Sequence, residues 1–232
     1  MIVSSSATRI LIRGIVDSHG VSTCCARGYE KFFGARTARR DGRRYRRKGL
    51  DKTARLIVDE LARRGVAGAT VLEIGGGIGA NGLELVKLGA AGVTIVELSH
   101  GYDEEAKALL TESGFEGRVA RLHGDFVAGE SDIAAADAVV LHRVVCCYPD
   151  PDALVGAAAR HARRLLALSF PRETWWIRAG SRVANVFFRR VGWIESFVHP
   201  HEAILGPAAA EGFAPIYEHS GRLWRVVVLE RP

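Results

Sequence analysis

The stretch Val71-Leu72-Glu73-Ile74-Gly75-Gly76-Gly77-Ile78-Gly79-Ala80 places a short apolar run directly before a glycine-rich turn. The residues from Val71 to Ile74 predict a buried strand, and those from Ala80 to Leu88 predict an amphipathic helix. The glycines therefore occupy a strand-to-helix turn, where the absence of Cβ lets a ligand touch the backbone. This arrangement is typical of a cofactor-binding turn.

Strands and helices alternate on both sides of this turn. Further strands are predicted at 93–98, 118–122, 136–141 and 165–170, and helices at 51–64, 102–112 and 152–164. Two last strands, at 213–218 and 223–229, predict a hairpin. The order predicts an α/β fold, namely a Rossmann-like doubly wound, mostly parallel seven-stranded sheet with an antiparallel C-terminal hairpin.

The length of 232 residues is enough for one sizeable core. We expect residues 1–22 to form a flexible lead and residues 23–232 to form a single domain. Within that domain, residues 23–50 predict an N-terminal helical lid, and residues 172–205 predict a substrate-side helical insert. No apolar run approaches the roughly 18 residues that a membrane-spanning helix needs, and no signal peptide is evident, so a cytoplasmic location is expected.

The net charge of +6 is carried mainly by arginine, and residues 36–48 form the densest basic run. Such a run is usually a solvated helical face, and the embedded Tyr45 makes a substrate-facing segment the second interpretation. Nucleic acid is not expected as a partner because no base-stacking aromatic motif accompanies the charge. Among the partners that such a charge suits, we expect an anionic small-molecule acceptor.

Four cysteines form two adjacent pairs, Cys24-Cys25 and Cys146-Cys147. Neither pair has the spacing of a metal site, and adjacent cysteines rarely share one tetrahedral ion. We therefore expect reduced thiols and no metal.

Polar residues follow the ends of successive predicted strands. Glu73, Glu97, Asp125 and His142 each lie at or just past such an end. Ligands of doubly wound sheets bind beyond the carboxyl ends of the strands, so these side chains are candidates for one site.

The glycine turn allows two interpretations. Residues 77–82 fit the pattern GxGxxG, and Glu97 follows Gly77 by 20 positions, as in a dinucleotide site. The alternative is the acid-x-Gly-x-Gly form given by Glu73, Gly75 and Gly77. An acid before the glycines suits a cationic amino group and a sulfonium, and it would oppose a pyrophosphate.

The three acids, the glycine turn and the hairpin together resemble the class I S-adenosylmethionine-dependent methyltransferases. The resemblance covers roughly residues 50–231 and implies S-adenosyl-L-methionine as the cofactor. It implies cofactor-binding roles for these residues: Glu73, Gly75, Gly77, Gly79, Glu97, Leu98, Asp125, Phe126 and His142. By that resemblance Glu97 would bind both ribose hydroxyls, Asp125 the adenine, and Glu73 the methionine amino group through its neighbourhood.

A weaker similarity is to the magnesium-protoporphyrin methyltransferases. The shared order is an aromatic and basic N-terminal segment, the glycine turn, an apolar strand that ends in a Tyr-Pro turn, and a Leu-Ser-Phe strand before Pro171. His142-Arg143 departs from that pattern, because an acidic residue followed by an apolar one is expected there. The similarity therefore implies the cofactor more firmly than the substrate.

Methyl transfer is an in-line displacement that requires alignment and the exclusion of water. His142 is the first candidate for substrate contact or general base, and Arg143 for anion binding. Tyr45, His199 and His201 are further substrate-side candidates. The sequence thus predicts a methyltransferase for a small-molecule acceptor, acting as a monomer or homodimer. An NAD(P)-dependent reductase and a non-catalytic partner subunit are the alternatives.

Overall fold

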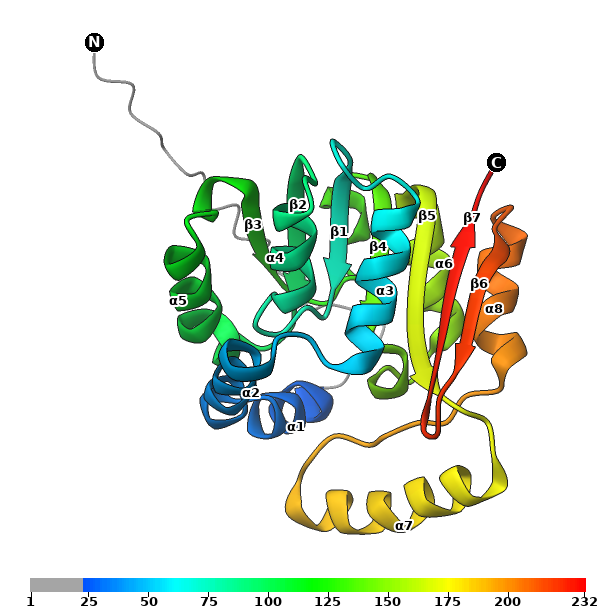
Figure 1. Cartoon of the computed structure of the whole chain (residues 1–232). Helices are drawn as coiled ribbons and strands as arrows, with labels where there is room; N and C mark the ends of the chain where they lie inside the picture. The colour runs from blue at the N-terminus through cyan, green and yellow to red at the C-terminus, as the bar shows by residue number, and fades with distance from the viewer. Residues whose placement is uncertain (1–22) are drawn as a thin grey trace.

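A seven-stranded sheet forms the centre of the computed structural model, which describes the backbone of residues 23–232 and side chains from Gly28 onward (Figure 1). The expected flexible lead at residues 1–22 lies outside the described residues. The strands are β1 (Thr70–Ile74), β2 (Gly92–Glu97), β3 (Val119–His123), β4 (Ala136–His142), β5 (Ala162–Pro171), β6 (Ala214–Ser220) and β7 (Trp224–Glu230). They lie in the order β3-β2-β1-β4-β5-β7-β6. The first five are parallel and β7 is antiparallel to both neighbours, so the predicted sheet is confirmed.

Helices cover both faces of the sheet. One apolar core joins the sheet to α3 (Lys52–Arg63) and α4 (Ala80–Lys87), and a second joins it to α6 (Pro151–His161) and α8 (His201–Ala210). Val71 belongs to the first core and Leu72 to the second, because successive strand residues point to opposite faces. Burial on both faces explains the continuous apolar runs of the central strands.

Three helices lie beyond the carboxyl ends of the parallel strands (Figure 1). They are α1 (Thr23–Phe32), α2 (Ala35–Lys48) and α7 (Trp175–Val191). The remaining helices are α5 (Asp103–Ser113) and the short 3-10 turns η1 (His100–Tyr102), η2 (Glu116–Arg118), η3 (Glu130–Asp132) and η4 (Val145–Cys147). Among the described helices, none combines the length and apolar character needed to cross a membrane.

The boundary between α6 and β5 was predicted wrongly. The helix ends at His161, and the strand begins at Ala162, which pairs with Ala136 of β4. Basic residues are common in the last turn of a helix, so Arg163 and Arg164 were assigned to the helix. They instead lie exposed on β5, within ion-pair distance of Asp137 and Glu230 respectively.

Helix α8 continues to Ala210, beyond the predicted helical insert at residues 172–205. Its sequence contains Gly206 and Pro207, which normally interrupt a helix. Ile204 and Ala208 are nevertheless fully buried in the core beside α6. Tertiary packing therefore stabilises a helix that its local sequence disfavours.

Candidate active site

The glycine turn after β1 has the backbone that its sequence requires. Gly75, Gly77 and Gly79 have φ values of 64°, 55° and 77°, a region that favours glycine. A Cβ on Gly75 would lie 2.6 Å from Cγ2 of Val144, and one on Gly77 would lie 3.3 Å from the Tyr102 ring. Side chains at these positions would fill the turn, so the glycines keep the backbone open to a ligand.

Glu73 lies behind this turn. Its side chain is buried and accepts hydrogen bonds from Asn81 Nδ2 at 2.8 Å and from the backbone N–H of Gly82 at 3.0 Å. Burial raises the pKa of Glu73 to about 7, against the opposing effect of these hydrogen bonds. The carboxylate thus holds the first turn of α4 against β1, and its influence on a ligand would be exerted through the turn.

Glu97 ends β2 beside the turn. One carboxylate oxygen accepts from the backbone N–H of Gly77 at 2.7 Å, and the other accepts from that of Ser99 at 3.0 Å. Burial raises the pKa of Glu97 despite these bonds. Arg121, which the sequence did not single out, donates to the Gly77 carbonyl at 2.9 Å. Glu97 of β2 and Arg121 of β3 therefore hold the turn between them by hydrogen bonds.

Asp125 and Phe126 follow β3 and line a small hollow next to the turn, together with Leu98 and Tyr148. Asp125 Oδ1 accepts from the backbone N–H of Val127 at 2.9 Å, and the Tyr148 hydroxyl lies 3.3 Å from the same oxygen. The hollow is mostly apolar and carries one carboxylate at its edge. That combination fits a flat heterocycle with an exocyclic amino group. Only the folded structure shows that Tyr148 lines this hollow.

A larger cavity of about 320 Å³ opens on the other side of the turn. The turn and Glu97 form one wall, and His142, Arg143 and α2 form the others. Tyr45 lies in this cavity, and its hydroxyl donates to Glu84. Burial and that hydrogen bond raise the pKa of Tyr45 to about 12, so the phenol keeps its proton at neutral pH. Arg40 and Arg44 of α2 add positive charge to the same cavity.

Asp51 joins His142 to Arg143 across the cavity floor. It caps α3 by accepting from the backbone N–H groups of Thr53 and Ala54. Its carboxylate also lies 3.5 Å from His142 Nε2 and 3.2 Å from Arg143 Nη2. Burial would raise the pKa of Asp51, but the neighbouring imidazole and guanidinium outweigh it and hold that pKa below its usual range. The sequence predicts Asp51 only as the first residue of the helix at 51–64.

His142 is largely buried, which lowers its pKa and favours the neutral imidazole. Its Nδ1 lies 2.9 Å from Ser169 Oγ, which itself accepts from the backbone N–H of Arg143. Because the ionised Asp51 carboxylate lies nearest Nε2, the imidazole proton is placed on Nε2, and Nδ1 then accepts from the Ser169 hydroxyl. This tautomer has no free lone pair directed into the cavity.

Arg143 adopts the left-handed backbone region, with φ 59°, which is rare for a residue with a side chain. Its guanidinium carbon lies 4.7 Å from the centre of the Trp224 ring. The strained backbone and the stacked guanidinium together aim a cation at the cavity. Such strain is often retained at functional positions.

His199 and His201 do not line the cavity. His199 Nε2 lies 2.9 Å from the backbone carbonyl of Tyr148, and His201 contacts Arg225 and Glu173. Both histidines connect the segment after α7 to the body of the protein. The structure therefore does not bring them together with His142.

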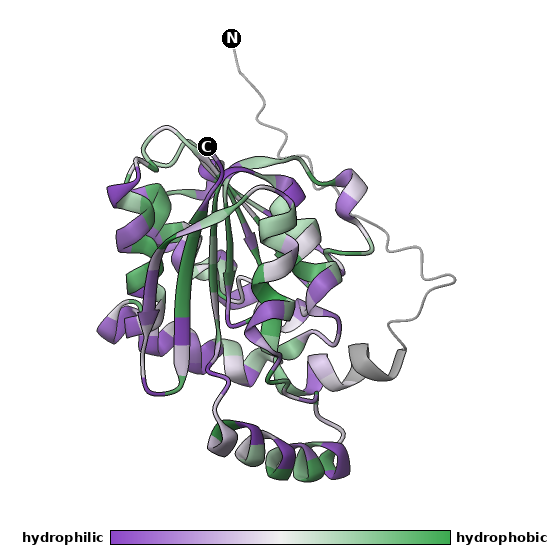
Figure 2. Cartoon of the chain, turned by 90° about the vertical axis from the view of Figure 1, so that its right-hand side faces the viewer, coloured by the Kyte–Doolittle hydropathy of each residue, from purple (hydrophilic) through white to green (hydrophobic). Residues whose placement is uncertain are grey.

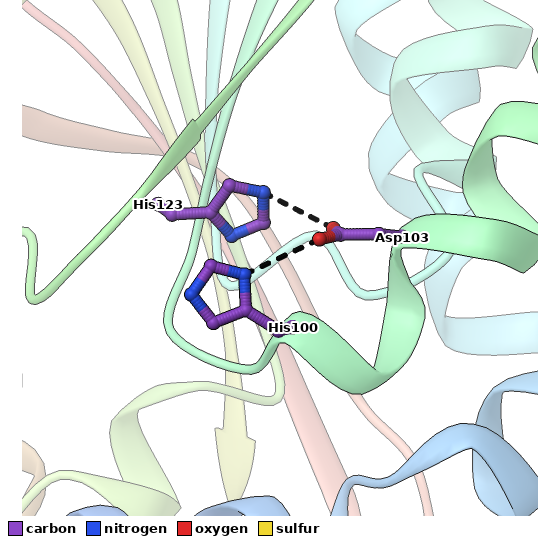
Figure 3. A group of neighbouring side chains, drawn as sticks. All are labelled: His100, Asp103 and His123. Carbon is purple, nitrogen blue, oxygen red and sulfur yellow. Dashed lines mark hydrogen bonds and ion pairs between the residues drawn. The ribbon is translucent and has the colours of Figure 1, made fainter. Parts of the chain in front are cut away.

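Two further groups of side chains have the chemistry of metal ligands. Cys146 and Cys147 are free thiols with Sγ atoms 3.6 Å apart, whereas the side chains of Cys24 and Cys25 lie outside the described residues. His100, Asp103 and His123 gather beside β2 and β3 (Figure 3). Figure 3 shows both imidazoles directed at the carboxylate, at 3.3 and 3.1 Å. Arg121 Nε, at 3.7 Å from Asp103, already supplies a cation that opposes a metal ion there.

One protein-family model matches the chain. The profile described as "Methyltransferase domain" matches residues 71–167, which include the glycine turn, Glu97, Asp125 and His142. Residues 71–167 therefore carry a methyltransferase domain. This assignment favours the methyltransferase interpretation of the glycine turn over a dinucleotide-binding one. No curated protein sequence matches the methyltransferase significantly.

Solved structures share the fold of this chain at low identity. Magnesium protoporphyrin IX methyltransferase from Synechocystis PCC 6803, with bound S-adenosylhomocysteine, has a TM-score of 0.66 at 20% identity, covering 88% of this chain and 98% of that one. An O-methyltransferase family protein from Burkholderia thailandensis has a TM-score of 0.67 at 18% identity, covering 88% and 63%. Geranyl diphosphate methyltransferase, in complex with GPP and sinefungin, has a TM-score of 0.60 at 14% identity, covering 77% and 76%.

The residues of the methyltransferase fit its cofactor, S-adenosyl-L-methionine. The open glycine turn admits the backbone approach, Glu97 is a buried acceptor on the cavity wall, and the hollow at Asp125 suits the adenine. The roles of the individual residues remain predictions from this geometry.

Proposed function

We propose that this methyltransferase transfers the methyl group to a small-molecule acceptor whose nucleophile is an already ionised oxygen, such as a carboxylate. The observation that carries the proposal is a histidine with no free lone pair in a cavity whose lining also includes three arginines. Arg40, Arg44 and Arg143 line the cavity, while the Nε2 proton of His142 is directed toward Asp51.

The chemistry of the acceptor decides what the protein must supply. The bound cofactor provides an electrophilic methyl group on a sulfonium. A hydroxyl or amine acceptor would need a base at the moment of transfer, whereas a carboxylate needs only placement. In this arrangement His142 and Tyr45 both keep their protons, so neither is free to act as a base. The geometry therefore supports an acceptor that only has to be positioned.

Each wall of the cavity has a distinct part in this proposal. The glycine turn and Glu97 orient the methyl donor, Arg143 and the α2 arginines hold the anion, and α1 and α2 exclude water. Alignment of the two reactants accounts for most of the rate in such a displacement. Two of the structural relatives are named for small-molecule acceptors, magnesium protoporphyrin IX and geranyl diphosphate, which supports an acceptor of that size.

The test is the chemical nature of the methylated product. The protein is incubated with methyl-labelled S-adenosylmethionine and a panel of small carboxylic acids, with the matching alcohols and amines as a second panel. We expect label in products that release methanol on mild alkaline treatment, as methyl esters do. Label only in alkali-stable ethers or methylamines would contradict the proposal for the acceptor. Failure to bind the cofactor in a separate calorimetric titration would contradict the site itself.

A further inference from the structure

Helix α7 carries a row of exposed apolar side chains on its outer side. Trp175 is 81% exposed, Val183 73% and Phe187 55%, and no residue of the helix is buried. Figure 2 shows the helix standing apart from the sheet, with hydrophobic and hydrophilic residues alternating along its ribbon. Among the described residues nothing covers this face. An apolar face of this kind usually marks an interaction site.

The orientation of α7 is fixed by polar contacts on its inner side. Ser181 Oγ donates to the Ser196 carbonyl at 2.6 Å, and Asn185 exchanges two hydrogen bonds of 2.9 Å with the backbone of Ser196. Phe188 packs against Trp193 and Phe32 on the same side. The outer side chains cannot turn inward without breaking these contacts, so their exposure is a property of the folded protein.

The charge of α7 restricts what can cover it. The helix holds four arginines, Arg178, Arg182, Arg189 and Arg190, and no acidic residue. Arg178 and Arg189 have ion-pair partners outside the helix, whereas Arg182 and Arg190 have none among the described residues. Pairing of this face with its own copy would bring arginines together, which is unfavourable. The partner should therefore be both anionic and apolar.

Tryptophan and valine on one side of a helix, flanked by arginine, are the composition of helices that lie in the interface of a bilayer. Arginine can pair there with lipid phosphate while its methylene groups stay in the apolar layer. Helix α2, which carries Arg43, Arg47 and Lys48, lies at the same end of the sheet (Figure 1). Two basic helices at the end that holds the cavity favour an extended anionic surface over a small ligand.

We propose that α7 binds the surface of an anionic lipid bilayer, with Trp175, Val183 and Phe187 entering the headgroup boundary and the arginines facing lipid phosphates. Binding in this way places the end of the sheet that bears the cavity toward the membrane. The proposal does not depend on the identity of the methyl acceptor.

Flotation of the full-length protein with lipid vesicles tests the proposal. We expect binding to phosphatidylcholine vesicles that contain phosphatidylglycerol, weaker binding to phosphatidylcholine alone, and loss of binding at high salt as surface charge is screened. The double variant Trp175→Ser, Val183→Ser should lower the partition coefficient by about tenfold or more, since two apolar side chains leave the interface. Arg182→Gln and Arg190→Gln should each lower it by about fivefold.

Matched variants at the opposite end of the sheet provide the controls. Leu88 is 45% exposed at the end of α4, and Arg163 is exposed at the start of β5. Leu88→Ser and Arg163→Gln should leave vesicle binding unchanged, and every variant should keep wild-type affinity for S-adenosylmethionine. Absence of wild-type binding to anionic vesicles would overturn the proposal. So would a concentration-dependent dimer that the Trp175 and Val183 substitutions abolish, because the face would then belong to a second copy.

Discussion

The carboxylate of Asp51 lies 3.5 Å from the imidazole Nε2 of His142 and 3.2 Å from the guanidinium of Arg143. One residue at the start of α3 therefore orients both polar side chains that follow β4. Because a helix cap and a strand end meet at this point, the acceptor side of the cavity depends on the packing of α3 against the sheet. The first two predictions address this cluster.

Replacement of His142 distinguishes an enzyme that only positions the acceptor from one that also uses a general base. If the acceptor arrives ionised, His142→Gln should lower turnover by less than about tenfold and leave the pH profile of turnover unchanged, whereas loss of a general base would cost about 10²–10⁴-fold. Arg143→Gln should be more damaging, with an acceptor KM higher by about 10–100-fold, because a charged hydrogen bond is lost. Steady-state kinetics from pH 5.5 to 8.5, a range of about one to two units around the ordinary histidine pKa, provide the measurement.

Asp51→Asn should reduce turnover without unfolding the protein. Asparagine caps a helix about as well as aspartate, so the free energy of unfolding should change by less than about 1 kcal/mol. The neutral amide no longer anchors Arg143, and we expect kcat to fall about tenfold while the Kd for S-adenosylmethionine stays within about threefold. Asp150→Asn, at the cap of α6 away from the cavity, is the matched control. Equal kcat values for the two variants would restrict Asp51 to its capping role.

Glu97→Gln should weaken cofactor binding selectively. The glutamine oxygen can still accept from Gly77 or Ser99, so the turn should keep its shape, but the charged acceptor that we propose for the ribose is lost. We expect the free energy of S-adenosylmethionine binding to weaken by about 1–3 kcal/mol in calorimetry. Glu116→Gln, an exposed glutamate in η2, should bind as the wild type does. An unchanged Kd for a folded Glu97→Gln protein would remove Glu97 from the site.

Glu73 should make the stability of the protein depend on pH. Its pKa is raised to about 7 by burial, whereas the unfolded chain has the ordinary glutamate value. The folded state then holds a proton that the unfolded state releases, so this contribution is complete below the unfolded pKa and declines as pH rises to about 7. The loss is about 3 kcal/mol for a shift of this size. Denaturant melts at pH 5 and pH 7.5 should show a flatter dependence for Glu73→Gln than for the wild type; equal slopes would contradict the assignment.

The local sequence correctly predicted those elements whose residue pattern is compatible with only one secondary structure. The apolar run before the glycines, the acid at the end of each early strand and the final hairpin are all confirmed as structure, because strand burial and glycine backbone freedom leave few alternatives. The boundary at Ala162 and the continuation of α8 to Ala210 were beyond these patterns. Arginine suits both a helix end and an exposed strand, and Pro207 signals a break that core packing overrides.

The sequence by itself determined the surroundings of the glycine turn, since the turn, Glu97 and Asp125 follow strands whose order is readable from periodicity. Only the tertiary structure decided the cluster on the opposite wall of the cavity. Asp51, Ser169 and His142 come from three distant segments, and their contact depends on the register of β4 with β5 and on the docking of α3. The outward face of α7 was equally unreadable, because an apolar stripe in a sequence is the same whether it faces a core or a partner. Only the packing of the other side of the helix shows which of its faces is left uncovered.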